Sequence, residues 1–452
     1  MANSKRSFGE EPLGELLRKQ AIPAAVGILV MSIYGIVDTL YVGRYVGAMG
    51  IGAITVNMPI TFLISSIGMA IGIGGSSVLS RAMGEGSDGK VQRIFGNMLF
   101  LTLTLSLFFV VVASFFQIPI LNLFGGKGEV LSPALQYFRI LLPSVPALAW
   151  AMMSNNVIRA EGHPRRAMYT MIVPAILNLI LDPIFIVVFE MGIEGAALAT
   201  TISYFGSALY TASFFLWGPS EMSLTWSCIR PSKSIMTEIG KLGSVTMARQ
   251  GTISVLSIVL NNSLFAFGGE MALASYGIIS RLLMFVNFPV LGITQGYVPI
   301  LGYNYGAKFY ERVSQLSRLA FYWATGIACG IFILLMIFTR PLVALFTEDI
   351  ALIERTVPAL RWVFAANPFL ATSFLGSAYF QAIGQARRAL ILGLSKQGFF
   401  LIPLILILPQ VVGVDGIWWS FPIADFGAAI LSWWLLSKNP YIGLWQGRKS
   451  SP

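Results

Sequence analysis

The sequence has little charge and few of the residues that build most catalytic centres. Of its 452 residues only 11% are charged and 56% are hydrophobic, which excludes a soluble enzyme and a disordered chain. His163 is the only histidine, and Cys228 and Cys329 lack the CxxC spacing of zinc and redox motifs. A GxxxxGK[ST] loop is also missing, so a pump driven through that nucleotide site is excluded. We therefore expect neither an enzyme nor a cofactor.

The hydrophobic residues gather in runs of about 20 or more, the length that crosses roughly 30 Å of hydrocarbon. A β-barrel is disfavoured, because its strands would alternate in polarity. The sequence predicts an all-α polytopic membrane protein with twelve transmembrane helices, at approximately 21–43, 51–80, 94–117, 131–158, 166–189, 193–217, 242–267, 271–302, 317–338, 353–382, 389–411 and 414–437.

The net charge of +10 fits cationic loops of a membrane protein and does not require a nucleic acid partner. With twelve spans, the basic residues of both termini and of alternate loops fall on one side. The other side has little beyond Arg44, Lys127 and Arg340. The positive-inside rule then predicts a multi-pass protein of the cell membrane with both termini in the cytoplasm.

The chain also repeats itself at an offset of 222 residues, without gaps over most of its first half. The matches include glycine, proline and charged residues, which shared hydrophobicity does not explain: Gly47 with Gly269, Gly74 with Gly296, Pro146 with Pro368, Arg139 with Arg361, and Gly162, Arg165 and Arg166 with Gly384, Arg387 and Arg388. One residue is then lost, so Gly192 meets Gly413. The repeat predicts a first lobe at 1–220, a cytoplasmic linker at 221–241, and a second lobe with a short tail at 242–452.

Each repeat holds six spans, an even number, so the two copies enter the membrane in the same direction. We expect two six-helix lobes related by a pseudo-two-fold axis along the membrane normal. Such a pair can rock about a central cleft, which is the alternating-access geometry of a secondary transporter.

Ionisable residues predicted inside spans carry the functional information, because a charge there is costly and marks ion or proton pathways. Asp38 lies in the first span, with Tyr34 one helical turn earlier. Asp182 lies in the fifth span, four residues after Asn178, and Thr200 follows at a similar depth in the sixth. These oxygens suit Na⁺, and the two carboxylates equally suit coupled protonation. Alternatively, Asp38 lies near the end of its span in contact with water, and Asp182 forms a structural polar link between helices.

The repeat shows that these polar groups belong to one lobe. At the repeat offset Asp38 meets Leu260, and Asp182 meets Pro403 or Leu404. Fold maintenance would be served alike in both lobes. We therefore infer that the first lobe holds the site of a coupling ion, while the second mainly supplies shape.

Other residues are weaker candidates for a substrate cavity. Asp425 in the last span is either a counter-charge for a substrate or a structural partner of Arg249 in the seventh. Asn155 and Asn156 face either a cavity or cytoplasmic water. We expect an adaptable cavity wall only if the helices concerned line the cleft. The residues that would form this wall are Met152, Met153, Met284 and Phe285.

Four segments resemble the multidrug and toxic compound extrusion family, and most closely its bacterial multidrug-efflux branch. They are SIYGIVDTLYVGRYVG, ILNLILDPIFIVVFEMGIEGAALATTIS, NNSLFAFGGEMALASYGIISRL and GYVPILGYNYGAKFYERV. The resemblance implies a twelve-helix antiporter that exports cationic, amphipathic organic compounds in exchange for Na⁺ or H⁺. It also implies a monomer in lipid, without an obligatory protein partner.

The resemblance assigns the family's amino-lobe cation site to residues of this chain: Asp38, Asn178, Asp182, Thr200 and Tyr34. Some members carry acids in the seventh and tenth helices, but this chain has none in the cores of those spans. The alternative is a lipid-linked oligosaccharide flippase of the same superfamily. Its cavity arginines would have to be Arg249 and Arg281, the only mid-chain candidates.

Overall fold

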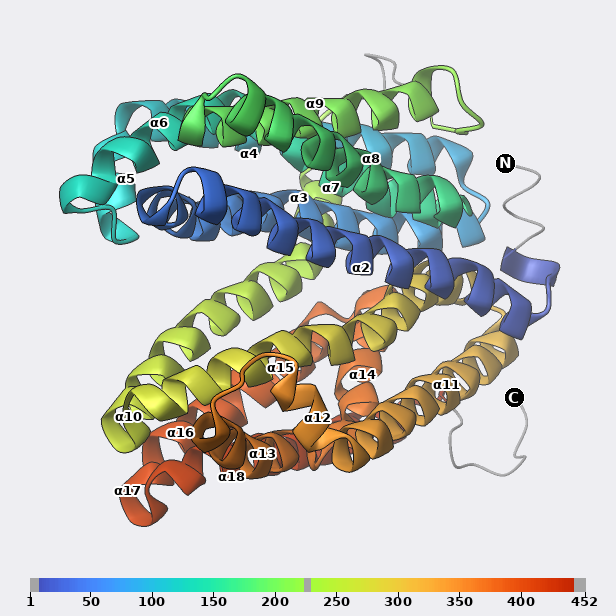
Figure 1. Cartoon of the computed structure of the whole chain (residues 1–452). Helices are drawn as coiled ribbons and strands as arrows, with labels where there is room; N and C mark the ends of the chain where they lie inside the picture. The colour runs from blue at the N-terminus through green and yellow to red at the C-terminus, as the bar shows by residue number, and fades with distance from the viewer. Residues whose placement is uncertain (1–7, 223–228, 443–452) are drawn as a thin grey trace. The chain divides into compact units, whose positions relative to one another are not determined.

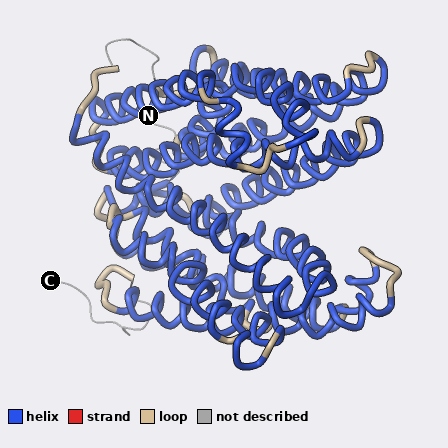
Figure 2. The backbone as a smooth tube through the Cα atoms, turned by 90° about the vertical axis from the view of Figure 1, so that its left-hand side faces the viewer, coloured by secondary structure: helices blue, strands red, loops and turns tan. Residues whose placement is uncertain are grey.

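The computed structural model describes residues 8–222 and 229–442, apart from the side chain of Ala48, so Cys228 lies outside the described part. Within those ranges the chain forms helices and connecting loops but no strand (Figure 2). The predicted all-α class is therefore confirmed. Contacts divide the chain into two units, one made of residues 1–8 and 26–243 and the other of residues 9–25 and 244–452.

The first unit takes its helices from the first half of the chain (Figure 1). Most of α2 (Leu13–Tyr45) is joined there by helices α3 (Ala48–Gly84), α4 (Asp88–Phe115), α5 (Gln117–Leu123), η1 (Gly128–Val130), α6 (Leu131–Leu141), η2 (Leu142–Ser144), α7 (Val145–Ala160), α8 (Pro164–Asp182), the π-helical η3 (Pro183–Val188) and α9 (Gly192–Leu216). Spans four and five are thus not continuous α-helices.

The second unit repeats this order. Its helices are α10 (Lys233–Gly306), α11 (Tyr310–Ile337), α12 (Thr339–Ala344), α13 (Ile350–Phe364), η5 (Asn367–Phe369), α14 (Leu370–Ala382), α15 (Ala386–Leu394), the π-helical η6 (Ser395–Leu401), α16 (Ile402–Ile407), α17 (Pro409–Val412) and α18 (Val414–Ser437). The long α10 consists of two helices that meet at Gly269, whose φ of 65° is left-handed. It therefore accounts for two predicted spans.

Among the described residues, eight helical stretches are long and apolar enough to cross a membrane, and the double helix α10 is one of them. Helix α9 covers the span predicted at 193–217. The spans predicted at 131–158 and 353–382 are broken by short 3₁₀ turns that contain Pro143 and Pro368. Proline lacks the N–H that a continuous helix needs, which explains both breaks.

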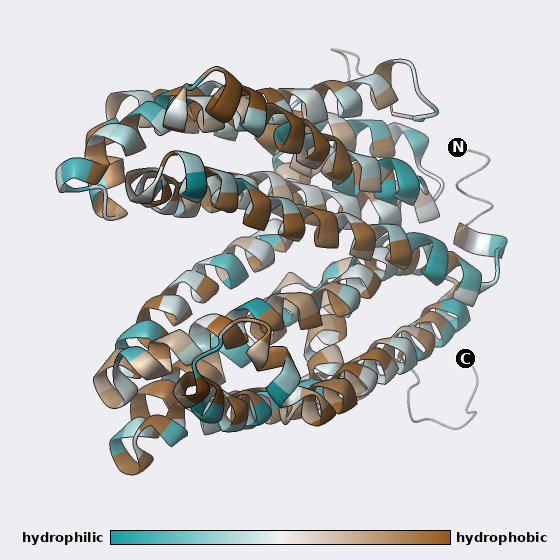
Figure 3. Cartoon of the chain, in the orientation of Figure 1, coloured by the Kyte–Doolittle hydropathy of each residue, from teal (hydrophilic) through white to brown (hydrophobic). Residues whose placement is uncertain are grey.

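Hydrophobic residues are spread along many of the helices (Figure 3). Large hydrophobic side chains such as Leu40, Phe108, Phe115 and Ile258 are exposed. Exposure of so much apolar surface is unfavourable in water and favourable against hydrocarbon. The chain is therefore a multi-pass membrane protein.

Corresponding positions of the two repeats have the same local geometry. Gly162 and Gly384 have φ angles of 84° and 85°, and Gly192 and Gly413 have 57° and 65°. This left-handed conformation favours glycine. The same offset relates two side-chain hydrogen bonds: Asn155 Nδ2 to the carbonyl of Ala167 (2.6 Å), and Ser377 Oγ to that of Ala389 (2.9 Å).

The beginnings of two helices, α2 and α10, pack in a different unit from the rest of the same helix. Residues 9–25 pack in the second unit, where a Cβ at Gly296 would lie 2.9 Å from the backbone nitrogen of Ala21. The first residues of α10 pack in the first unit, where a Cβ at Gly74 would lie 2.7 Å from the nitrogen of Gly243. The repeat offset converts one contact into the other. The predicted sequence boundaries did not include this arrangement.

Candidate cation site

The predicted acids come together in the first unit. Asp38 lies on α2, and Asp182 is the last residue of α8, directly before Pro183 and the π-helical η3. Proline and a π-helical turn both interrupt the regular backbone pattern, and π-turns are frequent at functional sites. The local sequence therefore places Asp182 at a break in its helix.

Both carboxyl groups are buried, with exposed fractions of 9% for Asp38 and 1% for Asp182. They are neighbours whose carboxyl groups interact electrostatically. Ionised carboxylates only accept hydrogen bonds, so such a pair needs a shared proton or a cation between its members. Among the described residues none donates a hydrogen bond to Asp38 Oδ1 or to either oxygen of Asp182.

Asn178 lies one helical turn before Asp182 on α8, and it contacts Thr200 on α9. Asn178 Nδ2 donates to Thr200 Oγ1 over 3.3 Å, which joins α8 to α9. Thr200 Oγ1 in turn donates to the carbonyl of Ala196 over 3.0 Å. The amide oxygen of Asn178 accepts no hydrogen bond from the described residues. Asn178 Nδ2 and Thr200 Oγ1 thus both donate within the protein, while the amide oxygen of Asn178 remains an unsatisfied acceptor.

Three tyrosines surround this group. Tyr34 on α2, Tyr137 on α6 and Tyr204 on α9 all interact electrostatically with Asp38. Tyr204 also lies beside Tyr34, and Tyr137 lies beside Thr200. Sequence reasoning found Tyr34 but missed the other two. The spacing of Thr200 and Tyr204, four residues apart on one helix, was the available signal.

This arrangement can hold one small cation or one proton. Its ligand atoms are carboxylate, amide and hydroxyl oxygens, which a hard cation such as Na⁺ prefers. The described residues contain no group of three or more His, Cys, Asp or Glu that could hold a metal ion. The acidic ligands of the candidate site are therefore the two carboxyl groups of Asp38 and Asp182.

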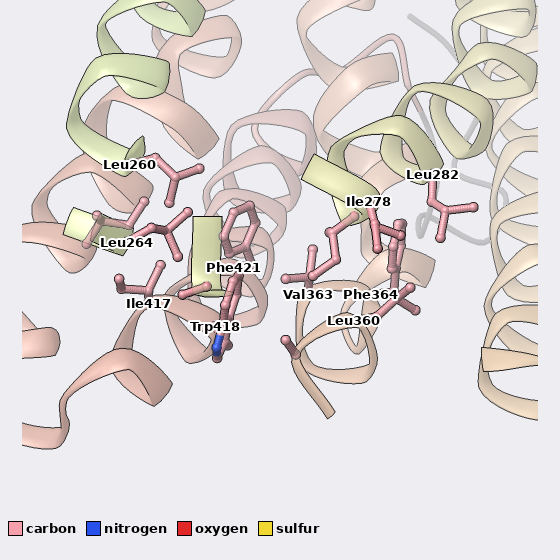
Figure 4. Packing of buried hydrophobic residues seen from close by; sticks show 14 of the residues in the cluster. Leu260, Leu264, Ile278, Leu282, Leu360, Val363, Phe364, Ile417, Trp418 and Phe421 are labelled. Carbon is pink, nitrogen blue, oxygen red and sulfur yellow. The ribbon is translucent and has the colours of Figure 1, made fainter. Parts of the chain in front are cut away.

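The counterparts of the two acids in the second unit are apolar. Leu260, the repeat counterpart of Asp38, is fully buried in a cluster with Leu264, Ile417 and Phe421 (Figure 4). Leu404, one of the two counterparts of Asp182, packs against the same cluster. The asymmetry expected from the sequence thus extends to the packing.

The predicted cavity residues are more dispersed. Asn155 joins α7 to α8, because its Nδ2 also donates to Thr170 Oγ1 (2.6 Å) while its oxygen accepts from Arg159. Asn156 Nδ2 bonds the carbonyl of Met152 on its own helix.

The remaining wall candidates differ in exposure. Met153 is fully buried, Met152 packs on the core of the first unit, and Met284 is exposed. Phe285 packs edge-on against Phe288, with the ring centroids 6.3 Å apart. The description of these residues as a cavity wall stays a prediction.

Asp425 pairs with a residue that sequence reasoning did not consider. Its Oδ1 lies 2.6 Å from Nζ of Lys396. The expected partner Arg249 is in no ion pair among the described residues, so that alternative is wrong. Lys396 lies within the span predicted at 389–411, on the π-helical η6, and its partner lies on α18.

Comparison with known proteins now adds to this geometry. The family model described as MatE matches twice, at residues 23–184 and 244–407, once in each repeat. The multidrug export protein MepA of Staphylococcus aureus (strain N315) is 30% identical over 422 residues, 92% of each chain.

Two solved structures show the same fold. One is an outward-facing multidrug resistance MATE family transporter of the MOP superfamily, with a TM-score of 0.90, 24% identity and coverage of 96% of this chain and 97% of that one. The other, described as protein A, has a TM-score of 0.89 and 38% identity over 97% and 98% of the two chains. The two units are the six-helix lobes of this fold. The chain belongs to the multidrug and toxic compound extrusion (MATE) family.

Proposed function

We propose that this chain is a multidrug efflux antiporter, which exports amphipathic organic cations in exchange for Na⁺ or H⁺. The observation that carries the proposal is the buried pair of Asp38 and Asp182, in which Asp38 Oδ1 and both oxygens of Asp182 lack donors among the described residues. The MepA relative is a multidrug export protein, which supports the same direction of transport.

The mechanism follows from the charge of the pair. A cation or proton from outside binds between Asp38 and Asp182 and removes the repulsion between the carboxylates. Because Asp38 lies on α2 and Asp182 on α8, neutralisation changes how these helices pack. That change displaces the drug and favours return to the inward-open state.

The membrane potential supplies part of the driving force. Inward movement of one positive charge is worth about 2.3 kcal/mol per 100 mV. For this potential to drive export, the coupling ion must enter from outside. We expect both termini to lie in the cytoplasm. The basic loops support that orientation by the positive-inside rule.

A lipid-linked oligosaccharide flippase remains the alternative, but the structure favours it less. Such a protein needs cationic side chains around an anionic pyrophosphate. Of the two candidates from the sequence, Arg281 is exposed and only Arg249 is partly buried.

The decisive experiment uses the purified full chain in proteoliposomes. A Na⁺ gradient and a pH gradient are imposed separately while efflux of ethidium is followed by fluorescence. We expect one gradient to drive efflux and the variants Asp38→Asn and Asp182→Asn to abolish it. Glu348→Gln, which removes an exposed acid, is the control and should transport normally. Full transport by both asparagine variants would exclude this coupling site.

A further inference from the structure

The second unit buries an ion pair that the proposed mechanism does not use. Lys396 Nζ and Asp425 Oδ1 are 2.6 Å apart, and the exposed fractions of the two side chains are 20% and 5%. The acid thus lies in the interior, while the ammonium is carried at the end of a flexible four-carbon chain.

The local backbone brings the two charges together. Lys396 lies on the π-helical η6, and Asp425 lies on α18. Close packing joins these elements, because a Cβ at Gly427 would meet the ring of Phe400 at 3.2 Å. The neighbouring Gln397 Oε1 is buried and accepts no hydrogen bond from the described residues. A π-helical turn with an unsatisfied polar atom is typical of a functional site.

The repeat places Asp425 at a position that corresponds to the cation site of the first unit. At the offset of 221 that relates Gly192 to Gly413, Asp425 meets Tyr204, the tyrosine beside Asp38. Lys396 meets Pro174 or Ala175. The first unit therefore packs the corresponding helices without this ion pair.

The energetics also argue against a purely structural role. Moving two charges out of water costs several kcal/mol per ion, and apolar residues of similar volume often stabilise a fold as well or better. A buried acid that must bind cations reversibly needs a neutralising group while it is empty. A lysine on a flexible chain supplies such a group without leaving the protein.

We propose that Asp425 binds the cationic group of the exported compound, and that Lys396 is a tethered cation that occupies Asp425 when no compound is bound. The compound displaces the ammonium of Lys396, and its own positive charge then neutralises Asp425. This inference rests on the proposed export of organic cations and names the carboxylate that receives them. It assigns the two lobes different cations, an inorganic ion in the first and an organic cation in the second.

The test measures binding of tetraphenylphosphonium to the purified full chain by isothermal titration calorimetry. If Lys396 occupies Asp425 about nine-tenths of the time, it raises the apparent Kd about tenfold. We therefore expect Lys396→Met to bind about tenfold more tightly than the wild type. Asp425→Asn should bind at least tenfold more weakly, and the double variant should match Asp425→Asn.

The matched control is Lys233→Met, which removes an exposed positive charge at the beginning of α10 and should leave Kd unchanged. Lys396→Arg retains the charge and should bind like the wild type. Lys396→Gln repeats the measurement if the methionine variant does not yield monodisperse protein. The Lys396 variants decide the question alone if Asp425→Asn does not fold.

The possible outcomes separate this inference from the proposed function. A folded Lys396→Met or Lys396→Gln with an unchanged or higher Kd overturns the tethered cation, although wild-type binding and efflux leave organic-cation export intact. A wild type that neither binds nor transports organic cations overturns both proposals. Tighter binding that disappears on further replacement of Asp425 supports the inference.

Discussion

Replacement of Asp182 by asparagine should stabilise the cation-free protein and remove the stabilisation that a cation provides. Asp38 and Asp182 are buried neighbours, so both are ionised only at the expense of mutual repulsion. For unit charges about 4 Å apart at an effective dielectric constant of about 20, this repulsion is about 4 kcal/mol. Asparagine has nearly the same shape and no charge. Most of that energy should therefore be recovered in the variant.

Thermal unfolding of the purified protein in detergent checks this expectation. The wild type should gain several degrees in Tm on addition of Na⁺ or on acidification, according to which ion it couples, because the bound ion relieves the repulsion. Asp182→Asn should begin at the higher Tm and respond little to either ion. Glu348→Gln should behave as the wild type. A variant that is less stable than the wild type in every buffer, or that keeps the full response, would refute the reasoning.

Two further predictions concern the first unit. Glu161, between α7 and α8, accepts hydrogen bonds from Ser220, and its burial raises its pKa from 4.5 to about 8. The folded state thus binds more protons than the unfolded state between these values, and stability should fall as the pH rises from about 4.5 to about 8 and then level off. Glu161→Gln should flatten this slope in unfolding measured from pH 5 to 9; an unchanged slope contradicts the assignment. Gly74→Ala should destabilise the protein by roughly 1–3 kcal/mol, because its Cβ would lie 2.6 Å from the carbonyl oxygen of Ile239. Its control is Gly240→Ala, which meets nothing within 4 Å, and equal unfolding temperatures for the two variants would contradict the close approach.

The sequence predicted the membrane class and the helices well, since the length of an apolar run and the cost of burying a bare backbone are local properties. It also predicted which repeat keeps acids at the depth of Asp38, because Leu260 is visibly apolar. It did not predict that helix α10 is two helices joined at Gly269 without a loop. Nor did it identify Tyr137, whose helix is broken by the 3₁₀ turn after Leu141.

The partner of Asp425 shows why such failures occur. Helical periodicity gives the face of a residue on its own helix, but not the helix that this face meets. Arg249 and Lys396 were equally available as cations by sequence, and only the π-helical turn of η6 turned Lys396 toward α18.

By itself, the amino-acid sequence determined that this protein lies in a membrane, how many helical spans it has and which lobe holds the paired acids. Each of these depends on composition within one segment or on comparison of a segment with its copy. Only the tertiary structure decided that Asp38 and Asp182 are neighbours, that three tyrosines surround them, and that residues 9–25 pack in the second unit. These facts depend on which helix faces pack together, and packing is decided by contacts between residues far apart in the chain.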